Sequence, residues 1–118
     1  MRRATLGSAR AAIGGVLLGV AAFAAGPALA ADDAAIAKKA KEICAACHGP
    51  DGNTPTTPDF PKLAGQHYDY LLHSLKAYKS GARKNPIMAP MAQALSLAEM
   101  EGLAAYYARQ PGTLVTKR

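Results

Sequence analysis

Residues 44–48 read Cys44-Ala45-Ala46-Cys47-His48, and this stretch decides what the rest of the chain folds around. Two thiols separated by two residues and followed directly by an imidazole form the motif that attaches a c-type haem covalently. Each thiol adds across one vinyl group of the porphyrin, and the histidine that follows ligates the iron from the proximal side. The motif predicts one haem c bound through Cys44 and Cys47, with His48 as a metal ligand.

The same motif admits other interpretations. A Cys-x-x-Cys pair also serves thiol-disulfide exchange, a plain structural disulfide or half of a zinc site. The chain has only two Cys, and His67 and His73 lie far along it, so a four-ligand zinc site lacks donors nearby. A thioredoxin-like protein would carry the pair after a strand, whereas an Ala- and Lys-rich helical stretch precedes it here. We favour haem and keep a haem-free thiol-disulfide oxidoreductase, or a structural disulfide, as the alternative.

The first 30 residues have the pattern of a secretory signal peptide. Three Arg flank the start of an apolar run over residues 11–25, and Ala28-Leu29-Ala30 is a cleavage signal of small residues. We expect cleavage after Ala30, export to the periplasm and a single domain over residues 31–118. Glycines and a proline interrupt the apolar run and argue against a membrane span, although an uncleaved anchor in the membrane remains an alternative.

The charge of the exported part is modest. Three of the 14 Lys and Arg lie in the leader, so residues 31–118 carry a net charge of +3, compared with +6 for the whole chain. A mild positive balance suits docking of redox protein donors and acceptors with acidic faces, because electrostatic steering raises association rates. The lysines are scattered and no basic run alternates with aromatics, so no nucleic-acid partner is expected.

The spacing of apolar residues predicts an all-α domain with three main helices and long loops. The first helix covers residues 34–43 and delivers the haem-binding turn, and the second covers residues 66–80 before Gly81 ends it. The last helix starts at Ser96, runs to about residue 109 and begins with a capping box. The expected buried faces are Ile36, Ala40, Ile43 and Cys47 on the first helix, Leu71, Leu75 and Tyr78 on the second, and Leu97, Met100, Leu103, Ala104 and Tyr107 on the last.

Two irregular segments separate these helices. Residues 49–61 hold four prolines and two glycines, which exclude regular structure, and a loop of this length in a small domain usually wraps a ligand. Residues 82–91 form the second expected loop and carry two methionines and two prolines. A domain of this size has a marginal apolar core, so the haem acts as a staple and the haem-free chain should be poorly folded.

Taken in order, the motifs resemble the class I c-type cytochromes, in particular small bacterial monohaem forms and one half of the bacterial dihaem cytochromes. The resemblance implies a cytochrome c fold over residues 31–118, with three main helices and long loops around one covalently attached haem. The motifs that carry it are Cys44-Ala-Ala-Cys47-His48-Gly49, Asp59-Phe-Pro-Lys-Leu-Ala-Gly-Gln66, Met88 placed seven residues before Leu95-Ser96, and Leu103-Ala-Ala-Tyr106.

The resemblance also implies a second iron ligand. In this family a Met sulfur from the later loop completes the iron coordination, and Met88 has the matching spacing to the start of the last helix. Met91 is the other candidate, although a Met beside a helix more often packs in the core. With His48 and Met88 both bound, no coordination position remains for a substrate, so the resemblance implies an electron-transfer protein and not an enzyme.

Further roles around the haem follow from the resemblance alone. The Pro61 carbonyl is expected to accept a hydrogen bond from His48, although Pro61 also suits a plain loop end. Tyr106 is expected to pack against the first helix near the haem, as a core aromatic would also do. The first helix lacks the glycine and aromatic often found at this crossing, and Ala37 and Ala40 are expected to make the close contact. Candidate donors to the haem propionates are Gln66, Tyr70, Arg83 and Asn85.

The function expected from these features is that of a periplasmic one-electron carrier. The alternative is a cytochrome subunit that accepts electrons inside a larger redox enzyme, such as a flavin-containing sulfide dehydrogenase, to which some similar cytochromes belong. Size does not decide between the two, because both use the same small haem domain.

Overall fold

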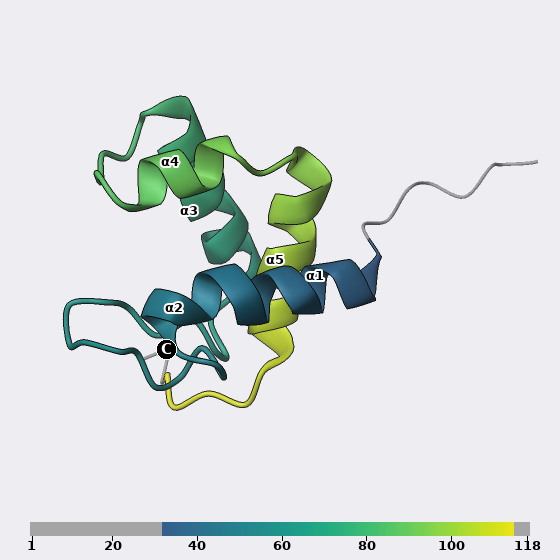
Figure 1. Ribbon diagram of the computed structural model, residues 1–118. Coiled ribbons are helices and arrows are strands. Elements are labelled where there is room, and N and C mark those ends of the chain that lie inside the picture. The colour runs from purple at the N-terminus through teal and green to yellow at the C-terminus, as the bar shows by residue number, and fades with distance from the viewer. Residues whose placement is uncertain (1–31, 115–118) are drawn as a thin grey trace, which may run out of the picture.

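The computed structural model describes residues 32–114, which fold into helices joined by loops, with no β-strand among them (Figure 1). This confirms the all-α prediction. The predicted signal peptide, with its cleavage site after Ala30, lies outside the described residues. Within residues 32–114, no helix has the length and hydropathy needed to cross a membrane.

The first three elements follow one another as a single helical rod, and the end of this rod contains the Cys-x-x-Cys-His motif. They are α1 (Asp33–Lys39), a π-helical turn η1 (Ala40–Cys44) and α2 (Ala45–His48). Asp32 caps the start, since its side chain accepts a hydrogen bond from the Ala34 N–H at 3.0 Å. The helix predicted over residues 34–43 therefore extends through the whole motif.

The π turn keeps residues that are spaced by four on the side of the rod that packs against the core. Ile36, Ala40 and His48 are only 3, 1 and 5% exposed, and Cys44 packs against the core cluster. These residues are spaced by four, and four residues of an α-helix rotate about 40° beyond a full turn. A π turn has more residues per turn, so the one closed by the Ala45 N–H and the Ala40 carbonyl compensates for this extra rotation. The prediction that Ile43 is buried is wrong, because the π turn rotates it outward and leaves it 48% exposed.

Two longer helices complete the framework and match their predicted positions closely. α3 (Tyr68–Ser80) ends at Gly81, whose φ of 79° gives the left-handed cap expected of a glycine there. α5 (Leu97–Arg109) begins with the predicted capping box: the Ser96 hydroxyl accepts from the Glu99 N–H at 3.1 Å, and the Glu99 carboxylate accepts from the Ser96 N–H at 2.8 Å.

A short helix, α4 (Met88–Gln93), occupies part of the segment expected to be a loop. Pro90 does not prevent it, because Pro90 is the third residue of the helix and N–H groups in the first turn have no intrahelical partner. Asn85 supplies the missing cap, since its side-chain oxygen accepts from the N–H groups of Ile87 and Met88, both at 2.9 Å. The loop prediction over residues 82–91 is therefore corrected at its C-terminal end.

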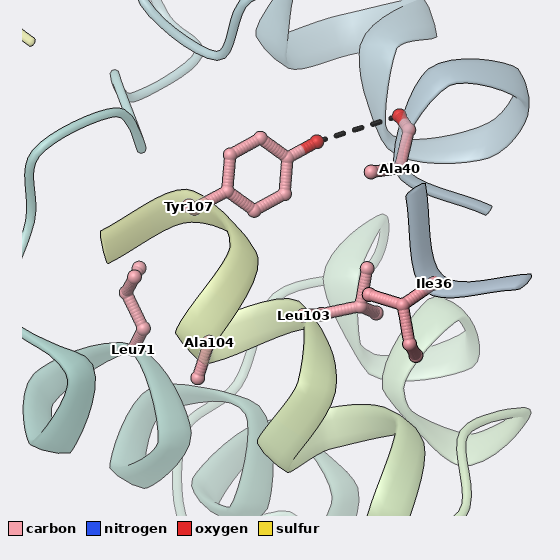
Figure 2. Close-up of a cluster of buried hydrophobic side chains, with 6 residues drawn as sticks. All are labelled: Ile36, Ala40, Leu71, Leu103, Ala104 and Tyr107. Atoms are coloured by element: carbon pink, nitrogen blue, oxygen red, sulfur yellow. Dashed lines mark hydrogen bonds between the residues drawn. The ribbon is translucent and has the colours of Figure 1, made fainter. Parts of the chain in front are cut away.

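The core forms where α1 and α3 both pack on α5 (Figures 1 and 2). Gly102 lies at the crossing with α1, where an added Cβ would meet Ile36 Cγ1 at 2.7 Å. The predicted face of α5 is confirmed from Met100 onward, but Leu97, in the first turn, is 51% exposed. The buried cluster consists of Ile36, Ala40, Leu71, Leu103, Ala104 and Tyr107.

Candidate functional site

His48 is buried and has one ring nitrogen engaged. Its Nδ1 lies 2.8 Å from the Pro61 carbonyl oxygen, and the ring is 5% exposed. A carbonyl only accepts hydrogen bonds, so Nδ1 must carry the proton and Nε2 keeps its lone pair. When one ring nitrogen of a metal-binding histidine donates to a carbonyl, this hydrogen bond fixes the tautomer and raises the basicity of the other nitrogen. The hydrogen bond between His48 and Pro61 is the one that the family resemblance implies.

The proline-rich loop is anchored back onto the motif that it follows. Gly49 ends α2 with φ of 81°, and an added Cβ there would lie 2.0 Å from the Thr54 carbonyl oxygen. The Thr56 N–H donates to the Cys47 carbonyl at 3.0 Å. The Asp51 carboxylate accepts hydrogen bonds from the N–H groups of Asn53 and Thr54, and these lower the pKa of Asp51. These contacts hold the loop so that its far end presents the Pro61 carbonyl to His48.

The same loop lines an open hollow that includes Pro61 and Phe60. Phe60 lies close to the imidazole, with the two ring centroids 6.4 Å apart and the ring planes at 60°. The hollow combines apolar prolines and an aromatic ring with two hydroxyls and one ammonium group. Its lining residues are Pro55, Thr56, Thr57, Pro58, Phe60, Pro61 and Lys62.

Both cysteines are free thiols, half-buried on the same helical rod. Burial raises the pKa of Cys44, while a hydrogen bond with Tyr107 and the charge of Lys39 act in the opposite direction. Neither thiol is consumed in a disulfide, and the adjacent buried imidazole has a free Nε2. The residues present therefore fit one covalent haem c, held through Cys44 and Cys47 with His48 as an iron ligand.

The two candidate methionines differ in their placement. Met88 is the first residue of α4 and half-buried, whereas Met91 is 41% exposed. The helices that carry His48 and Met88, α2 and α4, share no extended contact within residues 32–114. The backbone of Met88 is fixed by Asn85, as described above, which gives this methionine a more defined position than a loop would.

Tyr106 and its neighbour Tyr107 both pack in the core region that includes Ile36 and Ala40 of the first helical rod. Tyr107 is 4% exposed, and its hydroxyl donates to the Ala40 carbonyl on the first helical rod at 3.4 Å (Figure 2). Burial raises the pKa of Tyr107. Tyr106 is half-buried, packs at the edge of the core and meets the Tyr107 ring edge-on, with centroids 5.1 Å apart. The spacing of Tyr107 from Leu103 and Ala104 was the sequence signal for this role.

The glycine at the helix crossing was not predicted from the sequence. It is Gly102 on α5, and it faces Ile36. Ala40, the first residue of η1, is buried as expected, but Ala37 on α1 is only half-buried. The family resemblance places this glycine on the first helix, whereas here it stands within the periodic apolar stretch of the last helix.

The candidate propionate donors are engaged to different degrees. Arg83 donates to the Ser74 hydroxyl at 3.2 Å and lies over the Tyr78 ring, 4.7 Å from its centroid. Asn85 caps α4 through its side-chain oxygen, and the Gln66 side-chain oxygen accepts from a neighbouring N–H at 2.9 Å. Tyr70 is 52% exposed. His67 and His73 are exposed, as expected of surface residues.

Comparison with known proteins agrees with this geometry. The family profile described as cytochrome c matches residues 23–108. A cytochrome c4 of Thiocapsa roseopersicina is 51% identical over 75 residues, 64% of this chain and 38% of the relative. Cytochrome c-554(548) of Halomonas halodenitrificans is 45% identical over 83 residues, 68% of this chain and 99% of that protein. A thiosulfate dehydrogenase electron acceptor of Stutzerimonas stutzeri is 44% identical over 75 residues, 64% of this chain and 35% of the relative.

The solved structures give the same result. Reduced recombinant cytochrome c4 from Pseudomonas stutzeri superimposes with a TM-score of 0.62 at 40% identity, covering 70% of this chain and 47% of that one. The chain thus spans less than half the length of the cytochrome c4 relatives and nearly all of the shorter one. Its helical architecture, its haem-binding motif and these matches show that the chain belongs to the cytochrome c family.

Proposed function

We propose that this chain is a one-electron carrier that uses a covalently bound haem c with His48 and Met88 as axial ligands. The observation that carries the proposal is the bond from His48 Nδ1 to the Pro61 carbonyl, which leaves Nε2 available beside two free thiols. When bound, the haem supplies an iron that cycles between the ferrous and ferric states.

The residues of the chain would set the properties of that iron. Pro61 holds the His48 ring and increases its donor strength. Met88 contributes a soft, neutral sulfur, which favours the ferrous state and raises the reduction potential relative to a second imidazole. If His48 and Met88 both ligate the iron, no coordination position would remain for a substrate, which would suit electron transfer. Tyr106, at the edge of the core, is proposed to lie near the haem.

We propose that the protein is located in the periplasm. The support is the leader over residues 1–30, with cleavage proposed after Ala30 so that haem attachment takes place on the exported chain.

Visible and near-infrared spectra of the haem-loaded protein test the proposal. Haem absorbance that survives denaturation shows covalent attachment, and a colourless protein with a titratable disulfide would support a thiol oxidoreductase instead. In the ferric protein, Met88→Ala should abolish the near-infrared band of sulfur-to-iron charge transfer, whereas Met91→Ala should keep it. The opposite pattern would assign the ligand to Met91.

A second candidate function is that of an electron-accepting partner or subunit of a redox enzyme. The observation in its favour is the similarity to a thiosulfate dehydrogenase electron acceptor. The flavin-containing sulfide dehydrogenase considered above belongs to the same class of partner. Reduction of the haem protein by either purified enzyme with its substrate separates these candidates, and rates that fall with ionic strength would show that the lysines steer docking.

A further inference from the structure

The end of α4, the helix that carries Met88, is tied to α3 by three hydrogen bonds. Lys79, in the last turn of α3, donates from Nζ to the Gln93 carbonyl at 3.1 Å and to the Leu95 carbonyl. In return, Gln93 Nε2 donates to the Lys79 carbonyl at 2.6 Å. Each side chain therefore bonds the other residue's backbone, and we call these three bonds the Lys79–Gln93 clamp.

α4 has little else to hold it on the protein. The helix has six residues, and a helix of that length is not stable by itself in water. Its only buried residue is Ala92, whereas Met91 is 41% exposed and the preceding Ile87 is 50% exposed. Within residues 32–114, α3 is the helix with which α4 shares an extended contact. Besides Ala92, only the half-buried Met88 and Ala89 add apolar contacts, so the polar contacts to α3 carry a large share of the stabilisation of α4.

The chemistry of the clamp suits this task. The last carbonyls of a helix have no intrahelical partner, and an ammonium group both bonds them and offsets their partial negative charge. Hydrogen bonds from a charged donor are stronger than neutral ones, and the half-buried position of Lys79 reduces screening by salt. Asn85 fixes the other end of α4 through the Met88 N–H.

We propose that the Lys79–Gln93 clamp controls how long Met88 stays bound to the iron, which makes Lys79 a positioning residue for the axial ligand. This inference rests on the proposed ligation by Met88. When the clamp is broken, α4 separates from α3 more often, the Met88 sulfur leaves its place more often, and the sixth coordination position becomes open to an external ligand.

The test measures the entry of imidazole into the ferric, haem-loaded protein. At saturating imidazole, the rate of binding equals the rate at which Met88 dissociates. Lys79→Leu should raise this limiting rate at least about fivefold, because it removes the two hydrogen bonds that the Lys79 ammonium group donates. Lys76→Leu is the matched control, because Lys76 is exposed on the same helix and makes no hydrogen bond or ion pair within the described residues. Lys79→Arg should restore a rate near that of the parent protein.

A second variant provides an independent test of the proposal if Lys79→Leu does not fold. Gln93 is exposed, so Gln93→Leu removes one bond of the clamp with little risk to the core, and it should raise the limiting rate about twofold to fivefold. Limiting rates equal to that of the parent in both variants overturn the inference, as does an equal increase in Lys76→Leu. A near-infrared band that persists in Met88→Ala refutes the ligand assignment itself, which distinguishes failure of the proposed function from failure of the clamp.

Discussion

At the scale of single residues, Gly102 determines how closely α1 approaches α5. An added Cβ would lie 2.7 Å from Ile36 Cγ1 and 2.8 Å from Ile36 Cδ1, both shorter than any stable contact. Overpacking of this kind costs about 1–3 kcal/mol, against a gain of up to about 1 kcal/mol from the better helix propensity of alanine. Gly102→Ala should therefore lower the free energy of unfolding by about 1–2 kcal/mol, as measured by urea denaturation of the haem protein.

The matched control for Gly102→Ala is the same change combined with Ile36→Ala, which removes both the Cγ1 and the Cδ1 atoms that an added Cβ would meet. The double variant should be less destabilised than the sum of the two single variants, because they share one contact. Additive effects would show that Ile36 is not the obstacle.

Tyr107 contributes mainly through its ring. The hydroxyl bond to the Ala40 carbonyl is long, at 3.4 Å, and that carbonyl also accepts from the Ala45 N–H. Tyr107→Phe should cost less than about 1 kcal/mol of unfolding free energy, whereas Tyr107→Ala should cost about 3–5 kcal/mol because it empties the centre of the core. Equal losses in the two variants would assign the main role to the hydroxyl.

At the scale of elements, Glu99 joins two helices. Its carboxylate accepts from the Ser96 N–H at the start of α5 and pairs with Lys39 of α1, with 2.7 Å between Nζ and Oε1. The hydrogen bond from Lys39 and the one from the Ser96 backbone lower the pKa of Glu99 from 4.5 to about 2. Because the folded-state pKa lies below the unfolded value, this stabilisation is complete above pH 4.5 and is lost as the pH falls toward 2.

Glu99→Gln should therefore flatten the loss of stability between pH 4.5 and about 2. At neutral pH the cost should be only about 1 kcal/mol, because the pair is partly exposed and solvent screens it. Urea denaturation across this pH range is the measurement. Glu101→Gln, an exposed glutamate on the same helix, is the control and should leave the pH profile unchanged. A steep acid transition retained in Glu99→Gln would point to another carboxylate.

At the scale of the whole molecule, the polypeptide supplies only a small core. The buried cluster has six members, two of which are alanines, and among residues 32–114 no large side chain is fully buried. A domain this small gains too little from apolar burial to offset its conformational entropy without a staple. The Cys44→Ser/Cys47→Ser variant, which cannot attach haem, should lack near-UV circular dichroism and unfold without a cooperative transition. A cooperative transition close to that of the haem-loaded protein would contradict this.

The sequence by itself determined the features that depend on neighbours along the chain. The Cys44 to His48 motif, the capping box at Ser96 and the glycine end of α3 are local, because their spacing alone fixes which groups can meet. The contact of His48 with Pro61 was also expected, but only through the resemblance to a family. Helix periodicity located α3 and α5 within about two residues, since their apolar faces repeat regularly.

Only the tertiary structure decided which of several suitable residues makes each contact between segments. It turned Ile43 outward through the π turn, joined the Tyr107 hydroxyl to the Ala40 carbonyl, and placed the close approach at Gly102. It also formed α4 and joined it to α3 through Lys79. The physical reason is that these outcomes depend on the packing of residues distant in sequence, where local propensity is too weak to choose.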